Sequence, residues 1–298
     1  MAKLQANGIE IEYDHFGDRG ADPLLLIMGL GAQMILWEEE FCGGLAERGH
    51  FVVRFDNRDA GLSSKFGEHG TPNLIEMMTK GASGQPVEAP YLLNDMADDA
   101  AGVLDALELD TAHVVGASMG GMIAQAVAIR HPQRVRTLTS IMSSTGNPEL
   151  PPADPEAMAV LMRERPKTRE ESIEAAVSAQ KVLSGPGFPF DEARIRERAA
   201  RVYDRAFYPE GMARQMTAIV ASGNRKPELA NVSAPTLVIH GDADPLVPIA
   251  GGHDTAEAVP GAELLVIEGM GHDLPPGAWP RVIDAITEHA KKASAFQA

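Results

Sequence analysis

A serine between two glycines is the first candidate for chemistry in this chain. The segment Gly116-Ala117-Ser118-Met119-Gly120 follows a β-branched run and precedes an apolar run of helical length, so it predicts a strand, a tight turn and a helix with Ser118 at the apex. A serine hydroxyl becomes a nucleophile only when it is exposed beside a base. Because a G-x-S-x-G pattern appears by chance in about one in eight shuffled chains of this composition, the hypothesis needs partners for Ser118.

Suitable partners for a nucleophilic serine follow later in the chain, in the order acid and then histidine. His272 stands in a glycine-rich turn directly after an apolar run that predicts a strand, where its imidazole can reach over the end of a sheet. Asp242 and Asp244 both follow the apolar run 235–240. We prefer Asp244 as the orienting acid and expect Asp242 to be a turn residue that accepts backbone hydrogen bonds, with Asp242 kept as the alternative acid.

Acyl transfer also requires hydrogen-bond donors for a developing oxyanion, and two backbone N–H groups are candidates. The N–H of Met119 lies directly after Ser118, at the start of the predicted helix, where the helix dipole favours negative charge. The N–H of Leu30 lies in the turn Met28-Gly29-Leu30-Gly31 at the end of another buried strand. The other histidines are assigned structural roles, and His253 and His289 are interpreted as solvated helical positions.

Strands and helices alternate along most of the chain, which predicts a mostly parallel, doubly wound sheet of eight strands. Asn7-Gly8 predicts an antiparallel hairpin at the N-terminal edge. The alternation stops after the sixth strand, where several helices are expected, and resumes near residue 235. The expected core comprises residues 1–143 and 231–298, and the expected helical cap comprises residues 144–230. Within the core, we expect a helix at 34–48 and an irregular excursion with one helical turn at 65–90.

Composition restricts the classes of partner. The formal net charge of −16 disfavours nucleic acid and anionic membranes as partners. Cys42 is the only cysteine, so neither an internal disulfide nor a cysteine metal cluster is expected, and we interpret Cys42 as buried filler. Without an apolar signal core or a run of about 18 apolar residues, the sequence predicts a soluble, cytoplasmic protein. The oligomeric state is left open.

The sequence resembles the α/β-hydrolase superfamily over nearly its whole length. The matching motifs are the serine turn 116–120, the loop 56–63, the acid segment 241–248 and the histidine turn 269–272. Within the superfamily, the Met28-Gly29 turn, the Arg58-Asp59-Ala60-Gly61 loop and Asp244-Pro245 look like the aclacinomycin methyl ester hydrolase branch. Many members have His-Gly where this chain has Met28-Gly29, so hydrogen bonds made by that histidine are replaced or absent.

The resemblance implies an α/β-hydrolase fold and a carboxylic ester hydrolase that needs no cofactor and no metal. Ser118 would attack, His272 would relay the proton, Asp244 would orient the imidazole, and water would release the acyl group. The expected substrate is a small to medium apolar ester. The same residues also suit a lactonase, thioesterase, C–C bond hydrolase or cofactor-free perhydrolase, and a ligand receptor on a hydrolase scaffold is a further alternative. Aspartate replaces the serine in haloalkane dehalogenases and epoxide hydrolases, which argues against both.

An apolar pocket beneath the cap is expected to hold the substrate. Methionine and aromatic residues of the predicted helices are candidate wall residues, although such stripes are more often ordinary packing. The candidates are Trp37, Met158, Met162, Phe207, Met212 and Met216.

Overall fold

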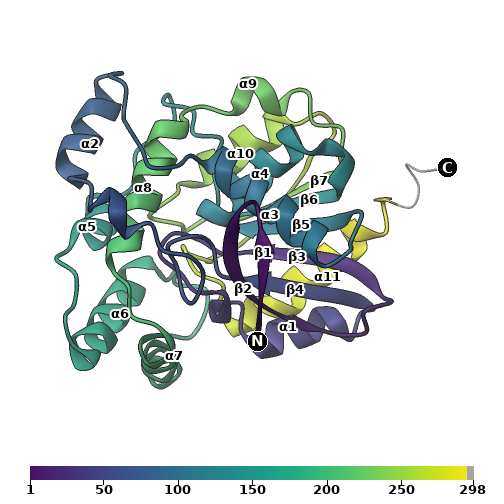
Figure 1. The fold of residues 1–298 in the computed structure, drawn as a ribbon, viewed down its shortest axis with the longest axis horizontal. Coiled ribbons are helices and arrows are strands. Elements are labelled where there is room, and N and C mark those ends of the chain that lie inside the picture. The colour runs from purple at the N-terminus through teal and green to yellow at the C-terminus, as the bar shows by residue number, and fades with distance from the viewer. Residues whose placement is uncertain (294–298) are drawn as a thin grey trace.

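A twisted sheet of eight strands forms the centre of the molecule (Figure 1). A computed structural model describes residues 1–293. The strand order is β1-β2-β4-β3-β5-β6-β7-β8; β2 runs antiparallel to β1 and β4, and all other neighbours are parallel. This architecture confirms the predicted sheet and its N-terminal hairpin. The strands are β1 (Ala2–Ala6), β2 (Ile9–Phe16), β3 (Asp22–Ile27), β4 (His50–Phe55), β5 (Ala112–Ala117), β6 (Val135–Ile141), β7 (Thr236–Gly241) and β8 (Glu263–Ile267).

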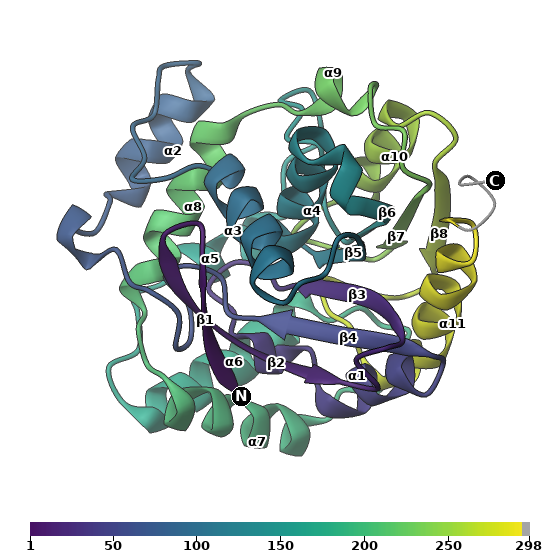
Figure 2. The same ribbon diagram turned by 45° about the vertical axis from the view of Figure 1, so that its right-hand side comes forward.

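Helices cover both faces of the sheet, as alternate residues of the central strands require. Leu25 and Ile27 of β3 belong to the apolar cluster that includes α3 and α4, whereas Leu24 and Leu26 belong to the cluster that includes α1 and α11. Figure 2 shows these two pairs of helices on opposite sides of the strands. A strand with both faces buried must be apolar throughout, which explains the continuous run in β3. The helices of these layers are α1 (Glu39–Ala46), α3 (Leu93–Ala106), α4 (Met119–Arg130), α10 (Ile249–Ala258) and α11 (Trp279–Ala290).

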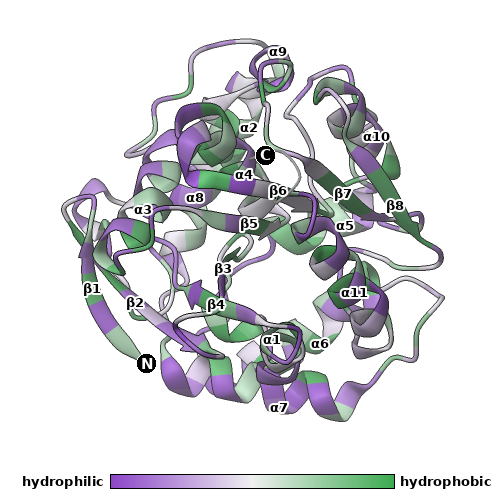
Figure 3. Cartoon of the chain, turned by 90° about the vertical axis from the view of Figure 1, so that its right-hand side faces the viewer, coloured by the Kyte–Doolittle hydropathy of each residue, from purple (hydrophilic) through white to green (hydrophobic). Residues whose placement is uncertain are grey.

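Five helices occupy the chain between β6 and β7. Figure 1 shows α5, α6, α7 and α8 grouped at one end of the molecule, together with α2. The helix α7 carries both purple, hydrophilic residues and green, hydrophobic residues in Figure 3, as expected for a helix with one face in contact with its neighbours. These inserted helices are α5 (Pro155–Met162), α6 (Arg169–Leu183), α7 (Glu192–Arg205), α8 (Glu210–Ser222) and α9 (Lys226–Leu229).

Two local predictions need correction. The helix expected at 34–48 is divided into a 3-10 turn, Met34–Leu36, and α1, because Trp37 and Glu38 leave helical geometry between them. The excursion at 65–90 contains more than one helical turn: α2 spans Leu74–Ala82. Its start is fixed by Asn73, whose side chain accepts hydrogen bonds from two backbone N–H groups of the first turn.

Several histidines are buried in the sheet and its helices. His289 is one of them: only 4% of it is exposed, and its Nε2 lies 3.0 Å from the Pro235 carbonyl oxygen, so its interpretation as a solvated position was wrong. It lies on the face of α11 that packs on the strands, a placement that the helix pattern alone did not reveal. Burial lowers the pKa of His50, His113, His240 and His289 from the usual 6.5, because desolvation disfavours the charged imidazole.

These histidines predict a loss of stability in mild acid. Each has a lower pKa in the folded chain than in the unfolded chain, so the unfolded chain binds more protons as the pH falls below 6.5. Each group then costs up to about 1.4 kcal/mol per pH unit. We expect the free energy of unfolding, measured with urea, to decline from pH 7 to pH 5.5, and H289Q to have a shallower decline. A constant value over this range would contradict the prediction.

Candidate active site

Ser118 occupies a strained turn between β5 and α4. Its φ is 56° and its ψ is −122°, a backbone conformation that residues with a side chain rarely adopt. The turn requires glycine at its two flanking positions, because a Cβ on Gly116 would lie 2.0 Å from the Gly120 carbonyl oxygen and one on Gly120 would lie 2.0 Å from the Ile27 carbonyl oxygen. The strain holds the Ser118 side chain above the carboxyl ends of the strands.

Ser118, His272 and Asp244 form a continuous hydrogen-bonded chain. His272 Nε2 lies 3.0 Å from Ser118 Oγ, and His272 Nδ1 lies 2.8 Å from Asp244 Oδ2. With hydrogen on Nδ1, the ring donates to Asp244 and accepts from the Ser118 hydroxyl. The backbone N–H of His272 donates to the Leu183 carbonyl at the end of α6, which ties the histidine turn to the inserted helices. The sequence-predicted trio is thus brought together from three different strand ends.

The two candidate acids have different surroundings. Asp242 is exposed, and its Oδ1 accepts a hydrogen bond of 2.6 Å from the Gly269 N–H, as a turn residue would. The side chain of Asp244 is fully buried, and its Oδ1 accepts from the N–H groups of Leu246 and Val247, which leaves Oδ2 for His272. Three hydrogen bonds therefore hold the Asp244 carboxylate in one orientation.

The turn 28–31 approaches Ser118 and is held from two sides. The Asn57 side chain donates to the Met28 carbonyl at 2.8 Å, and the Gly31 N–H donates to Gln215 Oε1 at 2.7 Å. Gln215 is fully buried in α8, and its Nε2 donates to the Arg58 carbonyl at 2.7 Å. The Asn57 and Gln215 side-chain amides therefore hold the turn in place. Within residues 1–293 the backbone N–H groups of Leu30 and Met119 have no hydrogen-bond partner.

A cavity of about 400 Å³ opens over Ser118 and His272. Of the six wall candidates, Trp37, Met158 and Met216 line it, and further apolar walls come from Leu161, Ile219 and Leu274. Phe207 lines a neighbouring cavity instead. Met162 ends α5, and Met212 packs beside Gly31; neither lines either of these two cavities. The space beside the serine is therefore apolar and large enough for a small organic ester.

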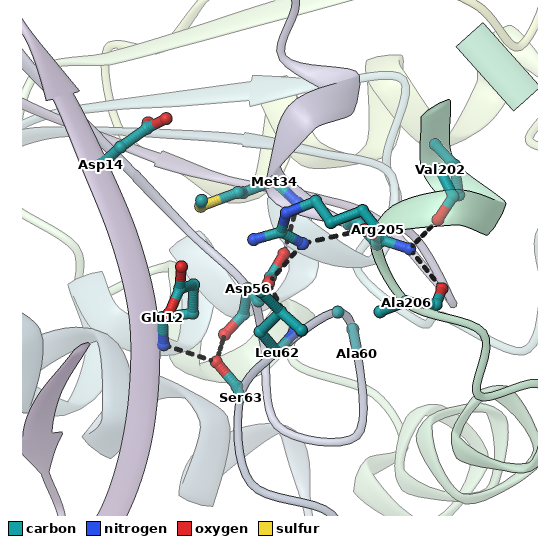
Figure 4. A network of polar contacts seen from close by, with 12 residues as sticks. Glu12, Asp14, Met34, Asp56, Ala60, Leu62, Ser63, Val202, Arg205 and Ala206 are labelled. Carbon is teal, nitrogen blue, oxygen red and sulfur yellow. Dashed lines mark hydrogen bonds and ion pairs between the residues drawn. The ribbon is translucent and has the colours of Figure 1, made fainter. Parts of the chain in front are cut away.

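A buried ion pair at the end of β4 connects the sheet to the inserted helices (Figure 4). Asp56 is fully buried; Oδ1 accepts from the Met34 N–H at 2.7 Å, and Oδ2 accepts from the Leu62 N–H at 2.8 Å. The Arg205 guanidinium, at the end of α7, lies 2.8 Å from Asp56 Oδ2. The Gln33 amide donates to the carbonyl of Val202 in the last turn of the same helix and to that of Ala206, directly after the helix. A buried carboxylate requires such partners.

A second buried ion pair, between Asp59 and Arg214, also joins the loop after β4 to an inserted helix. Both oxygens of Asp59 bind Arg214 of α8, at 2.8 and 2.9 Å, and the Tyr91 hydroxyl also donates to Asp59. The side chains of Asp59 and Arg214 are 0% and 1% exposed. In the sequence, the loop 56–63 is recognisable only as a family-like motif. Arg205, Arg214 and Gln215 are not recognisable as site residues, because nothing in their local sequence distinguishes them from other helical residues.

Other reactive groups do not join the site. Cys42 is buried, and desolvation raises the pKa of its thiol to about 12, consistent with a packing role. Among residues 1–293 no group of three or more His, Cys, Asp or Glu side chains is placed to hold a metal ion.

In the described part of the chain, none of the helices combines the length and apolar character that a bilayer crossing demands.

Comparison with known proteins identifies the family. Residues 22–275 match the model of the α/β-hydrolase fold family. The chain belongs to this family. The hydrolase is 32% identical to rhodomycin D methylesterase DauP of Streptomyces sp. (strain C5), with 93% of this chain and 94% of the relative covered. It is 31% identical to rhodomycin D methylesterase DnrP of Streptomyces peucetius, with the same coverage. These relatives confirm an enzyme of the serine hydrolase class that resembles esterases.

The fold agrees with solved structures. A meta-cleavage product hydrolase from Pseudomonas fluorescens IP01 superposes with a TM-score of 0.76 at 20% identity, covering 98% of each chain. At this identity the match concerns the fold alone, and it confirms the fold class expected from the sequence.

The Asp56–Arg205 pair predicts a large cost when one partner is removed. D56A leaves the Arg205 guanidinium, only 9% exposed, without its carboxylate and removes the acceptor for two backbone N–H groups. We expect the free energy of unfolding to fall by about 3–5 kcal/mol in urea titrations. As a control, D284A breaks the surface pair with Arg48 and should cost less than about 1 kcal/mol. Equal effects of the two variants would refute the anchoring role.

Proposed function

We propose that the hydrolase cleaves carboxylic esters through Ser118, His272 and Asp244, by way of an acyl-enzyme. The observation that carries the proposal is the pair of hydrogen bonds that link the three side chains, 3.0 Å from Ser118 to His272 and 2.8 Å from His272 to Asp244. A nucleophile, a base in hydrogen-bond contact with it and an acid that orients the base are the parts that acyl transfer needs. The esterase relatives support the same reaction.

The first half of the reaction forms the acyl-enzyme. His272 Nε2 takes the proton of the Ser118 hydroxyl as Oγ bonds to the ester carbonyl carbon. Asp244, held by its two backbone hydrogen bonds, keeps the ring oriented and stabilises the imidazolium that forms. The carbon–alkoxy bond then breaks, and the leaving oxygen takes the proton from His272. The alcohol departs and the acyl group stays on Ser118.

The second half repeats these roles with water. His272 accepts a proton from a water molecule whose oxygen bonds to the acyl carbon. The bond between this carbon and Ser118 Oγ breaks, and Oγ takes the proton back from His272. The products are a carboxylic acid and a free enzyme, so the cycle balances without a metal or a cofactor.

The oxyanion of each tetrahedral intermediate would bind the backbone N–H groups of Leu30 and Met119. Both are free of hydrogen bonds among the described residues, and Met119 begins α4. Free donors at a helix start are suited to a developing negative charge. Residues 144–230 would act as a helical cap over a core formed by 1–143 and 231–298, because α5, α6 and α8 contribute Met158, Leu183 and Met216 to the cavity over Ser118.

The proposed substrate combines a small alcohol with an apolar acid. The methylesterase relatives support methanol as the alcohol, and the methionine and leucine walls of the cavity favour an apolar acyl group. A methyl group demands little space, so most of the cavity would be available to the acid.

The triad predicts large and unequal losses of activity. S118A and H272A should abolish hydrolysis of p-nitrophenyl acetate and of methyl butanoate, and D244N should lower kcat by about 10⁴-fold because the imidazole loses its orientation. D242N is the matched control: it weakens one hydrogen bond to the Gly269 N–H and should retain most activity. Steady-state kinetics test this. Intact turnover in S118A would exclude the serine mechanism, and a larger loss in D242N than in D244N would reverse the choice of acid.

The turn that carries Leu30 predicts a role for Gln215 in catalysis. Q215L leaves the Gly31 N–H and the Arg58 carbonyl unpaired in a buried place and frees the turn to move. Because loss of one oxyanion donor costs about 10²–10³-fold in kcat, a misplaced one should cost about 10-fold or more, with little change in KM. T137V is the control, since it removes a buried hydrogen bond to His113 far from Ser118 and should lower stability without lowering kcat. Unchanged kcat in Q215L would contradict the assignment of Leu30.

A further inference from the structure

The turn that carries His272 is attached to the inserted helices by backbone hydrogen bonds. The His272 N–H donates to the Leu183 carbonyl at 2.8 Å, and the Gly187 N–H donates to the Gly269 carbonyl at 2.9 Å. The segment 183–187, which begins with the last residue of α6, therefore runs antiparallel to the histidine turn. An inserted helix thus reaches the backbone of the candidate base itself.

Glycines allow these two segments to approach so closely. A Cβ on Gly185 would lie 2.2 Å from the Gly269 carbonyl oxygen and 2.5 Å from the Gly271 nitrogen. A Cβ on Gly271 would lie 2.1 Å from the Leu183 carbonyl oxygen. Backbone therefore packs directly on backbone, and a displacement of the end of α6 is transmitted to Gly271, the residue before His272.

A group of side chains strengthens the same contact. Ser184 Oγ donates to Asp273 Oδ2 at 2.8 Å, and Gln180 Nε2 donates to the same oxygen at 3.0 Å. Arg198 of α7 fixes Gln180 in turn, since its Nη2 donates to Gln180 Oε1 at 3.0 Å. Because Asp273 directly follows His272, the inserted helices hold the chain on both sides of the histidine.

The Asp273 carboxyl group lowers stability in one respect. Within residues 1–293 its Oδ1 is buried without a hydrogen-bond partner, and a buried oxygen in this state is unfavourable. Burial also raises the pKa of this carboxyl group, because desolvation disfavours its charge. An apolar residue of the same size would avoid both costs, so a role in function explains the aspartate better than stability does.

We propose that Asp273 and Gly185 are positioning residues, which fix His272 on the end of α6 and thereby set the 3.0 Å distance from His272 Nε2 to Ser118 Oγ. This assignment rests on the proposed esterase function and adds to it a second support for the base. Asp244 orients the imidazole ring through Nδ1, whereas α6 fixes the backbone from which the ring extends. Both are needed because a base acts only within hydrogen-bond reach of its nucleophile.

A wedge between the two backbones tests the role of Gly185. G185A places a methyl group 2.2 Å from the Gly269 carbonyl oxygen, so the segments must separate. G43A is the matched control, because a Cβ at this position of α1 meets nothing within 4 Å. We expect G185A to lower kcat for p-nitrophenyl acetate and for methyl butanoate about 10-fold or more, with a smaller change in KM, since a misplacement of about 1 Å can cost about 10²-fold.

The control decides how this result is interpreted. G43A should leave kcat unchanged for both esters. Unchanged kcat in G185A, or equal losses in G185A and G43A, would overturn the assignment of Gly185.

Two substitutions of similar size test Asp273. D273N keeps an oxygen that can accept from Ser184 and Gln180, whereas D273L removes the acceptor together with the unpaired Oδ1. D273L should lower kcat about 10-fold while Tm stays the same or rises, and D273N should retain most of the activity. A fall in Tm together with kcat in D273L, or equal activities of D273L and D273N, would leave Asp273 a structural role only and overturn the proposal.

A double-mutant cycle tests whether Ser184 and Asp273 act as a pair. S184A removes the hydroxyl donor and should lower kcat about 3-fold in the wild-type background, with no further effect in the D273L background. Additive losses would show that the two residues act separately and would contradict the proposed pair.

A proton signal of His272 separates this proposal from the esterase function. The Nδ1 proton, which lies between His272 and Asp244, should give a downfield NMR resonance that is identified by its absence in H272Q. We expect this resonance to be unchanged in G43A and shifted or broadened in G185A and D273L, because the ring moves relative to Asp244. If the wild-type chain hydrolyses no ester but the resonance responds in this way, the esterase function fails and the positioning role remains. An unchanged resonance in both variants would overturn the positioning role, whatever the activity.

Discussion

The burial of two carboxylates at the end of β4 is the constraint on which the arrangement of the site depends. Asp56 and Asp59 are both fully enclosed, and an enclosed carboxylate is costly unless charged and hydrogen-bonding partners surround it. The ion-pair partners of both carboxylates come from the inserted helices: Arg205 pairs with Asp56 and Arg214 with Asp59. The two ion pairs fix α7 and α8 above the carboxyl ends of the strands.

The fixed helices shape both the turn that carries Leu30 and the cavities beside it. With α8 held by Arg214, Gln215 lies one residue away and reaches the turn that carries Leu30. With α7 held by Arg205, the small residues of α6 and α7 face a space that stays open. A displacement of these helices would therefore move a cavity wall and the proposed oxyanion donor, the Leu30 N–H, together.

Much of the fold could be predicted because its signals are local. The run at β3 is apolar throughout since both of its faces are covered, and the alternation of strands with helices allows few topologies. Local signals failed where contacts made elsewhere decide the outcome. The nine-residue helix α2 begins after a capping residue, Asn73, and packs on α8, within a stretch rich in glycine and proline. His289 has a polar side chain on a helix, yet the sheet buries it.

The amino-acid sequence alone specifies the residue types of the candidate site and their order: a serine in a glycine-flanked turn, then an aspartate, then a histidine after a strand. These features can be recognised because they depend on neighbouring residues. Gly116 and Gly120 provide the steric clearance for the turn, and the flanking apolar run shows that a residue stands at a strand end. The folded structure is needed to see which charges pair, which amide holds the turn at Gly31, and where the end of α6 meets the histidine turn. Those depend on distances between segments far apart in the chain, which packing sets and no local pattern records.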